Sequence, residues 1–355
     1  MISKELSKQI LTIGPNYTPP RGGIAQVLYT YNKEIFERFL FIKTTEPGNP
    51  IKKFICCFIA IIKFMYYCLC KDIKIVHIHT ASKNSFWRKS IFILISWLLK
   101  KKIVLHIHGG QFEAFVNHHP YILHLLKRCS RIVVLSPSKL VYYQEHFGLY
   151  NITVIKNVIP CPIIKEKDIS DTVNFLFLGF LCKDKGIYDL LDIISCNKDR
   201  FRGKMKLFIG GNGNVEKVKR IIKDNKLDQI VFYIGWVDGE KKIEILNNSH
   251  VYILPSYVEA LPISILEAMS YHLPVISTQI GAIPDIVIDN ENGFLVNPGD
   301  KDALNNAISE MISVTQEKRD TMGQRAFNLV QPYLSTNVSK DLEEMYLSLL
   351  KNKQS

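Results

Sequence analysis

Short apolar runs rich in β-branched residues alternate with longer segments of helical periodicity along most of the chain. Such runs, with few polar interruptions, are typical of strands in parallel sheets that helices cover on both faces. We expect two series of strands: residues 9–14, 73–80, 102–108, 131–136 and 152–157, then residues 173–179, 205–211, 229–235, 250–256 and 273–278.

The two series are separated by residues 157–171 (NVIPCPIIKEKDISD), which have no apolar period and contain two prolines. A chain of 355 residues is also too long for one ordinary core. We therefore predict an α/β protein with two Rossmann-like, doubly wound domains, 1–165 and 166–334, facing each other across a ligand-binding cleft. Residues 335–355 have the period of an amphipathic helix, which we expect to pack back toward the first domain.

Basic residues are concentrated in the predicted first domain. Residues 1–165 contain 23 Lys and Arg against 7 Asp and Glu, whereas the remaining 190 residues contain 22 and 26. A basic surface attracts nucleic acid, anionic lipid or an anionic substrate. Because no RNA-binding aromatic signature or helix-turn-helix pattern accompanies this charge, we expect no nucleic-acid partner.

Two apolar segments in this basic half, residues 54–70 and 86–102, are flanked by Lys and Arg. Neither provides the roughly 20 uninterrupted apolar residues of a membrane span, since Lys63 lies inside the first and Lys89 and Lys100 bound the core of the second. We interpret both as buried helices of an α/β layer. A helix lying in the membrane interface stays open as the alternative.

The N-terminus and the cysteines indicate a reducing compartment. No long apolar run follows a basic start in MISKELSKQILTIGP, so a secretory signal is not expected. The eight cysteines form no Cys-x-x-Cys pair, which argues against zinc, and we interpret them as reduced, buried apolar residues.

Histidines end two of the predicted strands, in VHIHT (76–80) and LHIHGG (105–110). Strand alternation places His77 with His79, and His106 with His108, each pair on one face. A metal site is one interpretation, but hydrogen bonding is the favoured one, and we expect no metal. His108 precedes two glycines at a strand end, so we expect it to point into the cleft.

Two loops could contact an anion. Gly22 and Gly23 open a helix after the first strand, where backbone N–H groups can approach a phosphate closely, although a tight turn alone would use the same residues. Lys185, in the loop after residues 173–179, could neutralise a phosphate or be a surface charge.

The segment EALPISILE (259–267) places a glutamate at each end of an apolar stretch. Pro262 suits the first turn of a helix, and the N–H groups of Ile263 and Ser264 would then be free for a diphosphate. Glu259 lies in the loop before this helix, and Glu267 lies about one turn into it. An anion site between two carboxylates suits a nucleotide-sugar.

At these residues the chain resembles a retaining glycosyltransferase of family 4, of the bacterial polysaccharide-biosynthesis type with the GT-B fold. The E-x7-E signature is present as Glu259 and Glu267, with EAMSYHLPVIST and GAIPDIVIDNENGFLVNPGD after it. GPNYTPPRGGI, HIHGG and GFLCKDKG occur in the family's order before it, so the resemblance spans nearly the whole chain.

The resemblance implies a role for each matching residue. Glu267 would bind the ribose hydroxyls, Glu259 and His108 the transferred sugar, and Gly235 with Trp236 would border the base. The diphosphate would lie against the following residues: Gly22, Gly23, Lys185, Leu261, Pro262, Ile263 and Ser264.

One position departs from the family pattern, because Phe180 stands where the family usually has an arginine. Either Lys185 and the helix terminus suffice for the donor phosphates, or another cation such as Arg21 compensates. A non-catalytic nucleotide-sugar-binding protein and a nucleotide-sugar epimerase therefore stay open as alternatives.

The reaction implied by the resemblance is hexosyl transfer from a nucleotide-diphosphate donor of the UDP-sugar class, with retention and without a metal or other cofactor. The acceptor would be a glycan or a lipid-linked precursor of a cell-surface polysaccharide. From the basic, aromatic-edged first half, we expect a cytoplasmic protein peripheral to the anionic inner face of the cell membrane.

Overall fold

The computed structural model describes residues 1–20, 22–46, 48–109, 111–165 and 172–351. The chain divides into two compact units: unit 1 contains Met1–Pro160 and Pro332–Ser355, and unit 2 contains Cys161–Gln331. The boundaries therefore lie at 160/161 and 331/332, where the sequence predicts 165/166 and 334/335. Each unit is described by itself.

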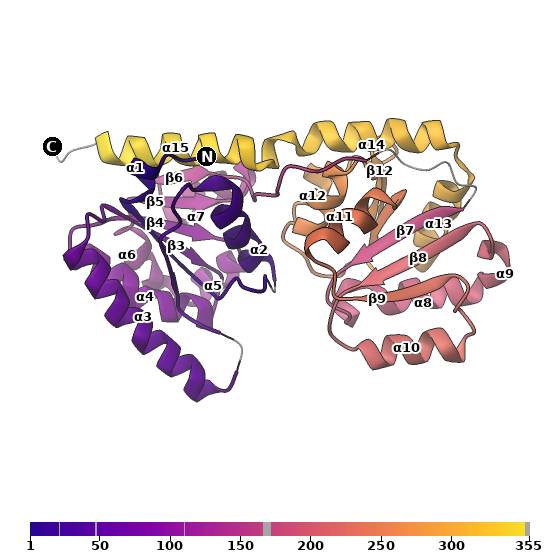
Figure 1. Ribbon diagram of the computed structural model, residues 1–355, viewed down its shortest axis with the longest axis horizontal. Helices are drawn as coiled ribbons and strands as arrows, with labels where there is room; N and C mark the ends of the chain where they lie inside the picture. The colour runs from indigo at the N-terminus through magenta and orange to yellow at the C-terminus, as the bar shows by residue number, and fades with distance from the viewer. Residues whose placement is uncertain (21, 47, 110, 166–171, 352–355) are drawn as a thin grey trace. The chain divides into compact units, whose positions relative to one another are not determined.

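In the described residues, unit 1 has a six-stranded parallel sheet in the order β2-β1-β3-β4-β5-β6 (Figure 1). The strands are β1 (Ile10–Gly14), β2 (Phe41–Lys43), β3 (Ile75–Thr80), β4 (Lys102–Ile107), β5 (Arg131–Val134) and β6 (Ile152–Val154). The helices are α1 (Lys4–Ser7), α2 (Gly23–Thr30), η1 (Tyr31–Ile35), α3 (Pro50–Cys70), α4 (Asn84–Leu98), α5 (Phe112–His118), η2 (Pro120–Ile122), α6 (Leu123–Leu126), α7 (Pro137–Phe147) and α15 (Ser335–Lys351), with η5 (Gln331–Tyr333) at the unit boundary.

The two faces of this sheet differ in chemistry. Side chains from β3 and β4 such as Val76, Ile78 and Leu105 belong to an apolar core that includes Phe64 of α3 and Phe92 of α4. The alternate positions carry histidines, whose rings lie beside Tyr31 of η1 and Tyr346 of α15. The period-2 alternation of strands therefore separates a hydrocarbon face from a polar aromatic face.

The interpretation of residues 54–70 as a buried helix is wrong. In α3, every third or fourth residue is buried, but Phe54 is 73% exposed and most apolar residues on its flank are exposed too. Residues 86–102 are a mixture, since α4 buries Phe86, Phe92 and Ile93, while Leu98 at the end of the same helix is 68% exposed. Helical periodicity identifies the helices, but both carry more apolar surface than the sheet can cover.

The cysteine interpretation is partly wrong as well. No disulfide joins any of the eight cysteines, which all lie in the described residues. Cys56, Cys68 and Cys129 are buried, Cys57 and Cys182 are partly buried, and the remaining three are exposed.

In its described residues, unit 2 has a second six-stranded parallel sheet, ordered β12-β11-β10-β7-β8-β9 (Figure 1). The strands are β7 (Val173–Leu178), β8 (Met205–Gly210), β9 (Val231–Gly235), β10 (Val251–Leu254), β11 (Val275–Thr278) and β12 (Gly293–Val296). The helices are η3 (Lys183–Lys185), α8 (Ile187–Cys196), α9 (Lys198–Phe201), α10 (Val215–Asp224), α11 (Gly239–Asn247), α12 (Ile263–Ser270), η4 (Ile283–Asp285), α13 (Lys301–Ser313) and α14 (Gln316–Val330).

The ten predicted strands are confirmed within a few residues at their ends. The two strands that the sequence pattern misses, β2 and β12, are three and four residues long and lie at the sheet edges. Short edge strands carry little apolar periodicity, so the pattern has too few positions to reveal them.

The predicted linker is divided between the units, because residues 157–160 belong to unit 1 and residues 163–165 pack on unit 2. The Lys165 N–H donates a 2.8 Å hydrogen bond to Asn247 Oδ1 of α11, and the Ile163 N–H donates to the Tyr271 hydroxyl at 3.4 Å. Residues 166–171 of the linker lie outside the described residues.

Helix α15 is anchored to unit 1 by Tyr346, whose buried hydroxyl lies 2.6 Å from His77 Nδ1. Tyr346→Phe should lower the free energy of unfolding of the full chain by about 1–3 kcal/mol, because it leaves a buried imidazole nitrogen without its partner. Tyr346→Ala should cost more, about 3–5 kcal/mol, since it adds a cavity.

Urea unfolding measures both changes. Leu347→Ala, on the exposed side of the same helix, is the matched control and should change stability by less than about 0.5 kcal/mol. Equal stability of the Tyr346→Phe variant and the parent protein would contradict the anchoring role.

Candidate active site

The strand order of unit 2 creates a switch point between β7 and β10, which pair in parallel. From β7 the chain proceeds to β8 and β9 on one side, whereas β10, β11 and β12 follow on the other. The loops that leave β7 and β10 therefore diverge, and ligands of doubly wound sheets bind at the carboxyl ends of strands at such a point. These two loops carry Lys185 and Glu259.

Lys185 and Glu259 form an ion pair between Nζ and Oε1. The Ser256 hydroxyl donates a 3.2 Å hydrogen bond to the same carboxylate oxygen. Both charged side chains are mostly buried, so the pair is less screened than a surface pair. The sequence predicts Lys185 and Glu259 as site residues, and the structure brings them together.

The close approach of the two loops depends on Gly186. Its φ of +69° is in the left-handed region, and a Cβ at this position would lie 1.9 Å from the Pro255 carbonyl oxygen. Glycine alone satisfies both the backbone angle and the contact. Lys185 is thereby held against the loop that carries Glu259.

Helix α12 points its N-terminus into this loop region of unit 2. Its first helical residue is Ile263, and Pro262 is the N-cap with φ −67° and ψ 124°. The expectation that Pro262 lies within the first turn is thus wrong by one residue, because its ψ is extended rather than helical. The Pro262 carbonyl accepts from the Ile265 N–H, so the N–H groups of Ile263 and Ser264 precede the first intrahelical hydrogen bond.

Glu267 lies one turn further along α12 and is buried, with its side chain 8% exposed. Its carboxylate accepts a 2.6 Å hydrogen bond from Lys242 Nζ, which reaches it from α11. The sequence does not reveal this partner, because Lys242 is one of two adjacent lysines on a surface helix, 25 positions away.

Gly281 is a second contributor that the sequence analysis missed. Its φ is +55°, and a Cβ would lie 2.5 Å from the Glu259 carbonyl oxygen and 2.4 Å from that of Ala260. The neighbouring Ala282 N–H donates to the Ala260 carbonyl at 2.7 Å. The loop after β11 therefore supports the backbone of Glu259 directly.

The remaining predicted residues of unit 2 lie at other strand ends. Gly235 ends β9 with φ +80°, and the following Trp236 donates its indole N–H to Asp238 Oδ2 at 2.9 Å. Leu261, before the α12 N-cap, is buried. Phe180, at the position where the resemblance leads us to expect an arginine, is 58% exposed after β7, and Arg21 lies outside the described residues.

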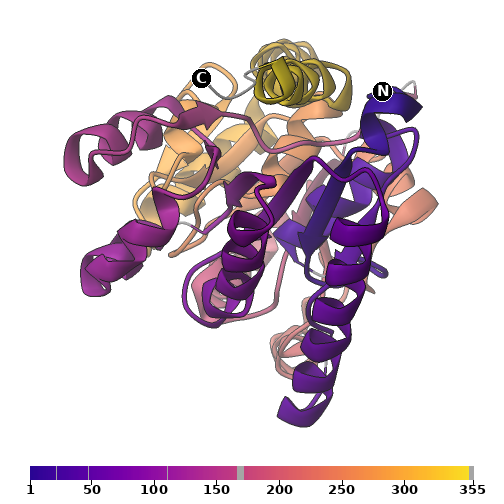
Figure 2. The same ribbon diagram turned by 90° about the vertical axis from the view of Figure 1, so that its left-hand side faces the viewer.

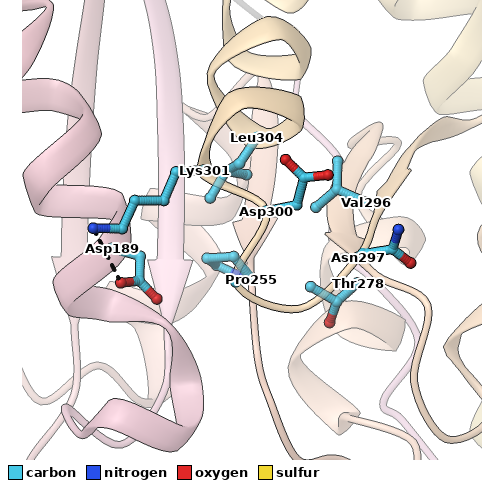
Figure 3. Close-up of a pocket in the computed structure, with 9 residues that line it drawn as sticks. Asp189, Pro255, Thr278, Val296, Asn297, Asp300, Lys301 and Leu304 are labelled. Carbon is cyan, nitrogen blue, oxygen red and sulfur yellow. Dashed lines mark ion pairs between the residues drawn. The ribbon is translucent and has the colours of Figure 1, made fainter.

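A small pocket lies behind the Pro255 loop, between α8 and α13 (Figure 3). Lys301 and Asp189 pair at one side of it, with 3.8 Å between Nζ and Oδ1, and the Tyr257 hydroxyl donates to Asp189 Oδ2 at 2.7 Å. Its space of about 10 Å³ is at the lower limit for one water molecule, so the pocket is too small to be a donor site. The residues around it support the Pro255 loop.

Gly22, Gly23 and His108 belong to unit 1. Gly22 has φ +96° and is the N-cap of α2, which begins at Gly23, so the pair opens a helix as predicted. His108 directly follows β4 instead of ending it, and its N–H still donates to the Thr80 carbonyl at 2.9 Å. Gly110 lies outside the described residues.

His108 belongs to a stack of four imidazoles, with His77 and His79 of β3 and His106 of β4. His79 Nδ1 lies 2.8 Å from His108 Nε2, and the rings of His77 and His106 are 2° from parallel with centroids 5.4 Å apart. Nitrogens of His77, His79 and His106 lie within 4.8 Å of one another. Because neighbouring rings lie face to face, the arrangement favours stacking, and the expectation of no metal stays a prediction.

Burial keeps these imidazoles neutral. Loss of water lowers the pKa of His77 and of His108 to about 3. At His108 a hydrogen bond with Asn157 partly opposes this lowering of the pKa. The pKa of His106 is also far below its usual range, first because of burial and then because of His108 and His77. A neutral His108 can donate or accept a hydrogen bond at physiological pH.

Unit 2 is similar to a known protein family. Residues 162–329 match the family model described as "Glycosyl transferases group 1". The matched residues make up nearly all of unit 2.

Two relatives align with parts of the chain. A 41.2 kDa protein of the cps region of Klebsiella pneumoniae is 25% identical over 246 residues, which are 68% of this chain and 62% of the relative. The lipopolysaccharide 1,6-galactosyltransferase of Salmonella typhimurium is 30% identical over 176 residues, which are 48% of this chain and 47% of the relative. The chain thus matches less than two thirds of either relative's length.

Among solved structures, Anabaena HepE in complex with UDP-glucose superposes with a TM-score of 0.75 at 16% identity, covering 96% of this chain and 99% of HepE. The fold is therefore that of the GT-B glycosyltransferases, with two Rossmann-like α/β units, as the sequence predicts.

The Lys242–Glu267 pair yields a stability prediction. Lys242→Met should destabilise the protein by about 3 kcal/mol, because it leaves the buried Glu267 carboxylate without its counter-charge. Adding Glu267→Gln should recover most of that loss, since the uncompensated charge is removed. Chemical denaturation of both variants measures the difference, and Lys241→Met, one position earlier on α11, is the control; a double variant no more stable than the single one would refute the coupling.

The histidine stack predicts acid lability. Unfolded histidines titrate near pH 6.5, whereas the buried ones do not, so the unfolded state takes up protons first and stability falls as the pH drops below about 6.5. His106→Met removes one such group, and should reduce this slope by about 1.4 kcal/mol per pH unit between about pH 6 and 4. Denaturation curves at several pH values test it, with His124→Met on α6 as the control; an unchanged slope would count against buried neutral His106.

Proposed function

We propose that this protein is a retaining hexosyltransferase that moves a sugar from a nucleotide-diphosphate donor to a glycan or lipid-linked acceptor in cell-surface polysaccharide biosynthesis. The observation that carries the proposal is the arrangement at the β7–β10 switch point. There the α12 N-terminus and Lys185 supply positive charge between two carboxylates, Glu259 and Glu267, within the residues that match the glycosyltransferase family model.

Neutralising the leaving diphosphate is the central requirement, because negative charge develops on it as the bond to the sugar breaks. Lys185 and the N–H groups of Ile263 and Ser264 are suited to that charge. In the proposed complex the diphosphate competes with Glu259 for Lys185. The Glu259 carboxylate is then released to accept hydrogen bonds from the hydroxyls of the transferred sugar.

The proposed reaction proceeds on one face of the sugar. The bond between the anomeric carbon and the β-phosphate oxygen breaks, the acceptor oxygen forms its bond from the same side, and the acceptor proton passes to the departing phosphate oxygen. This step assigns no proton transfer to a side chain of the enzyme and no role to a metal. Gly22, Gly23 and His108 would contact the donor from unit 1.

The proposed donor and acceptor classes are supported by the proteins to which the chain is similar. HepE was crystallised with UDP-glucose, and the Salmonella relative is a lipopolysaccharide galactosyltransferase, so a UDP-hexose and a surface glycan are the classes we propose here. The Klebsiella relative is named for its cps region. Glu267, buried beside Lys242, is the residue we assign to the ribose hydroxyls.

Glu259→Ala tests the assignment. We expect kcat/KM for transfer to fall by about 100-fold or more, because the carboxylate contacts the reacting sugar, while the fold is kept. Transfer from radiolabelled UDP-hexose to extracted lipid-linked glycan measures it. Glu291→Ala, an exposed glutamate in the same unit, is the control and should retain full activity.

The same assay separates the alternatives. Conversion of the donor to an epimer in the absence of acceptor would identify the protein as an epimerase. Tight donor binding without any product, with or without acceptor, would identify it as a binding protein. A parent-level rate for Glu259→Ala would overturn the site assignment itself.

A further inference from the structure

Helix α3 is apolar on the side that faces away from its own protein. Cys56, Ala60, Phe64 and Cys68, four residues apart, are buried against the sheet of unit 1. Phe54, Phe58, Ile62 and Tyr66 follow the same spacing but are exposed. Because the two rows are offset by two positions, about 200° around an α-helix, the exposed row lies directly opposite the core.

This exposed row is part of a broader flank of α3. Ile51, Ile55, Ile59 and Leu69 are exposed on the same side. The first five residues of the helix with described burial, 51–55, are all exposed, and Figure 1 shows this end of α3 projecting beyond the sheet of unit 1. Isolated exposed apolar residues are ordinary, but a contiguous apolar flank on a soluble domain marks an interaction site.

Helix α4 lies beside α3 and extends the same apolar surface. The two helices are in contact, with the rings of Phe64 and Phe92 5.3 Å apart, and Figure 2 shows them as neighbours on unit 1. The exposed apolar residues of α4 include Ile91, Leu94, Trp97 and Leu98. We call these exposed apolar residues of α3 and α4 the α3–α4 surface.

Basic residues surround the surface. Residues 48–109 contain 11 Lys and Arg and a single acidic residue, Asp72. Lys52 and Lys63 are exposed on α3, and the guanidinium of Arg128 lies 4.6 Å from the centroid of the Trp97 ring. Apolar residues combined with lysines and tryptophan are the composition of helices that lie in the headgroup region of a membrane.

We propose that the α3–α4 surface docks unit 1 on an anionic membrane, with α3 lying in the plane of the interface. By length and composition alone, Ile51–Cys70 is the one helix among the described residues that could cross a bilayer. However, Ala60 and Phe64 are part of the core of unit 1, so α3 cannot leave the sheet without exposing that core. In-plane binding keeps this packing and still buries Phe54, Phe58 and Ile62 in lipid.

A second copy of the chain fits this surface less well. A symmetric dimer places the same patch against itself, which would bring the lysines of both copies together. Protein interfaces are also depleted in lysine, whereas anionic headgroups attract it. Membrane docking would bring a lipid-linked acceptor to the enzyme, and this consequence rests on the proposed function.

Vesicle sedimentation of the full chain tests the apolar contribution. Wild-type protein should bind vesicles of phosphatidylglycerol and phosphatidylcholine at low salt. Phe54→Ser/Phe58→Ser/Ile62→Ser should reduce the partition coefficient at least about tenfold, because the variant lacks three apolar side chains that the lipid would bury. The matched control, Val141→Ser/Tyr150→Ser/Leu347→Ser, removes three exposed apolar residues elsewhere on unit 1 and should bind as the parent does.

The charge contribution is tested in the same way. Lys52→Ser/Lys53→Ser/Lys63→Ser should weaken binding to the anionic vesicles at least about tenfold and reduce its dependence on salt. Lys204→Ser/Lys206→Ser/Lys223→Ser, three exposed lysines of unit 2, is the control and should change neither. Vesicles of phosphatidylcholine alone should bind all the proteins weakly.

UDP binding and circular dichroism of every variant separate this inference from the proposed function. Parent-level vesicle binding by the α3 triple serine variant would overturn the docking surface. So would a wild-type dimer that the same variant converts to a monomer, because the surface would then join two copies. If the wild-type protein binds vesicles but transfers no sugar, the proposed function is refuted and the docking surface is not.

Discussion

The parallel pairing of β10 with β7 is the contact on which the candidate site depends. It brings together two loops 74 positions apart in the chain, so that Lys185 reaches the Glu259 carboxylate. Gly186 and Gly281 permit this because each lets backbone approach the Glu259 loop more closely than a side chain would. The α12 N-terminus follows directly from the same loop. Cation, carboxylate and free N–H groups are thus positioned by the sheet rather than by one another.

The charges at this site are held close to opposite charges before any donor arrives. Glu259 has Lys185 and Ser256, and Glu267 has Lys242. A buried carboxylate without a counter-charge would be strongly unfavourable, so these pairs allow the acidic residues to be buried at all. Buried ion pairs contribute little net stability, however, which makes a functional reason for keeping them more plausible than a structural one.

Unit 1 distributes its chemistry differently, because the two faces of its sheet serve different purposes. One face is hydrocarbon and holds α3 and α4; the other stacks four histidines against Tyr31 and Tyr346. The histidines are stable there as neutral rings, and α15 is joined to the sheet by the hydrogen bond and ring contact between Tyr346 and His77. The apolar residues that the sheet does not cover remain on the outside of α3. The same helix therefore belongs to the core and to the surface.

Periodicity and motif order in the sequence were sufficient to predict the two parallel sheets and ten of their strands. They also placed Glu259 before, and Glu267 within, the same helix. These properties are local, since alternation, helical spacing and a proline before a helix act within a few residues. Tertiary structure alone decided that Lys242 meets Glu267, that Gly281 supports Glu259, and that the outer flank of α3 is uncovered. Each of these depends on which distant segments the strand order places side by side. An apolar helix has the same sequence pattern whether or not another element covers it, so the pattern could not distinguish a buried helix from an exposed one.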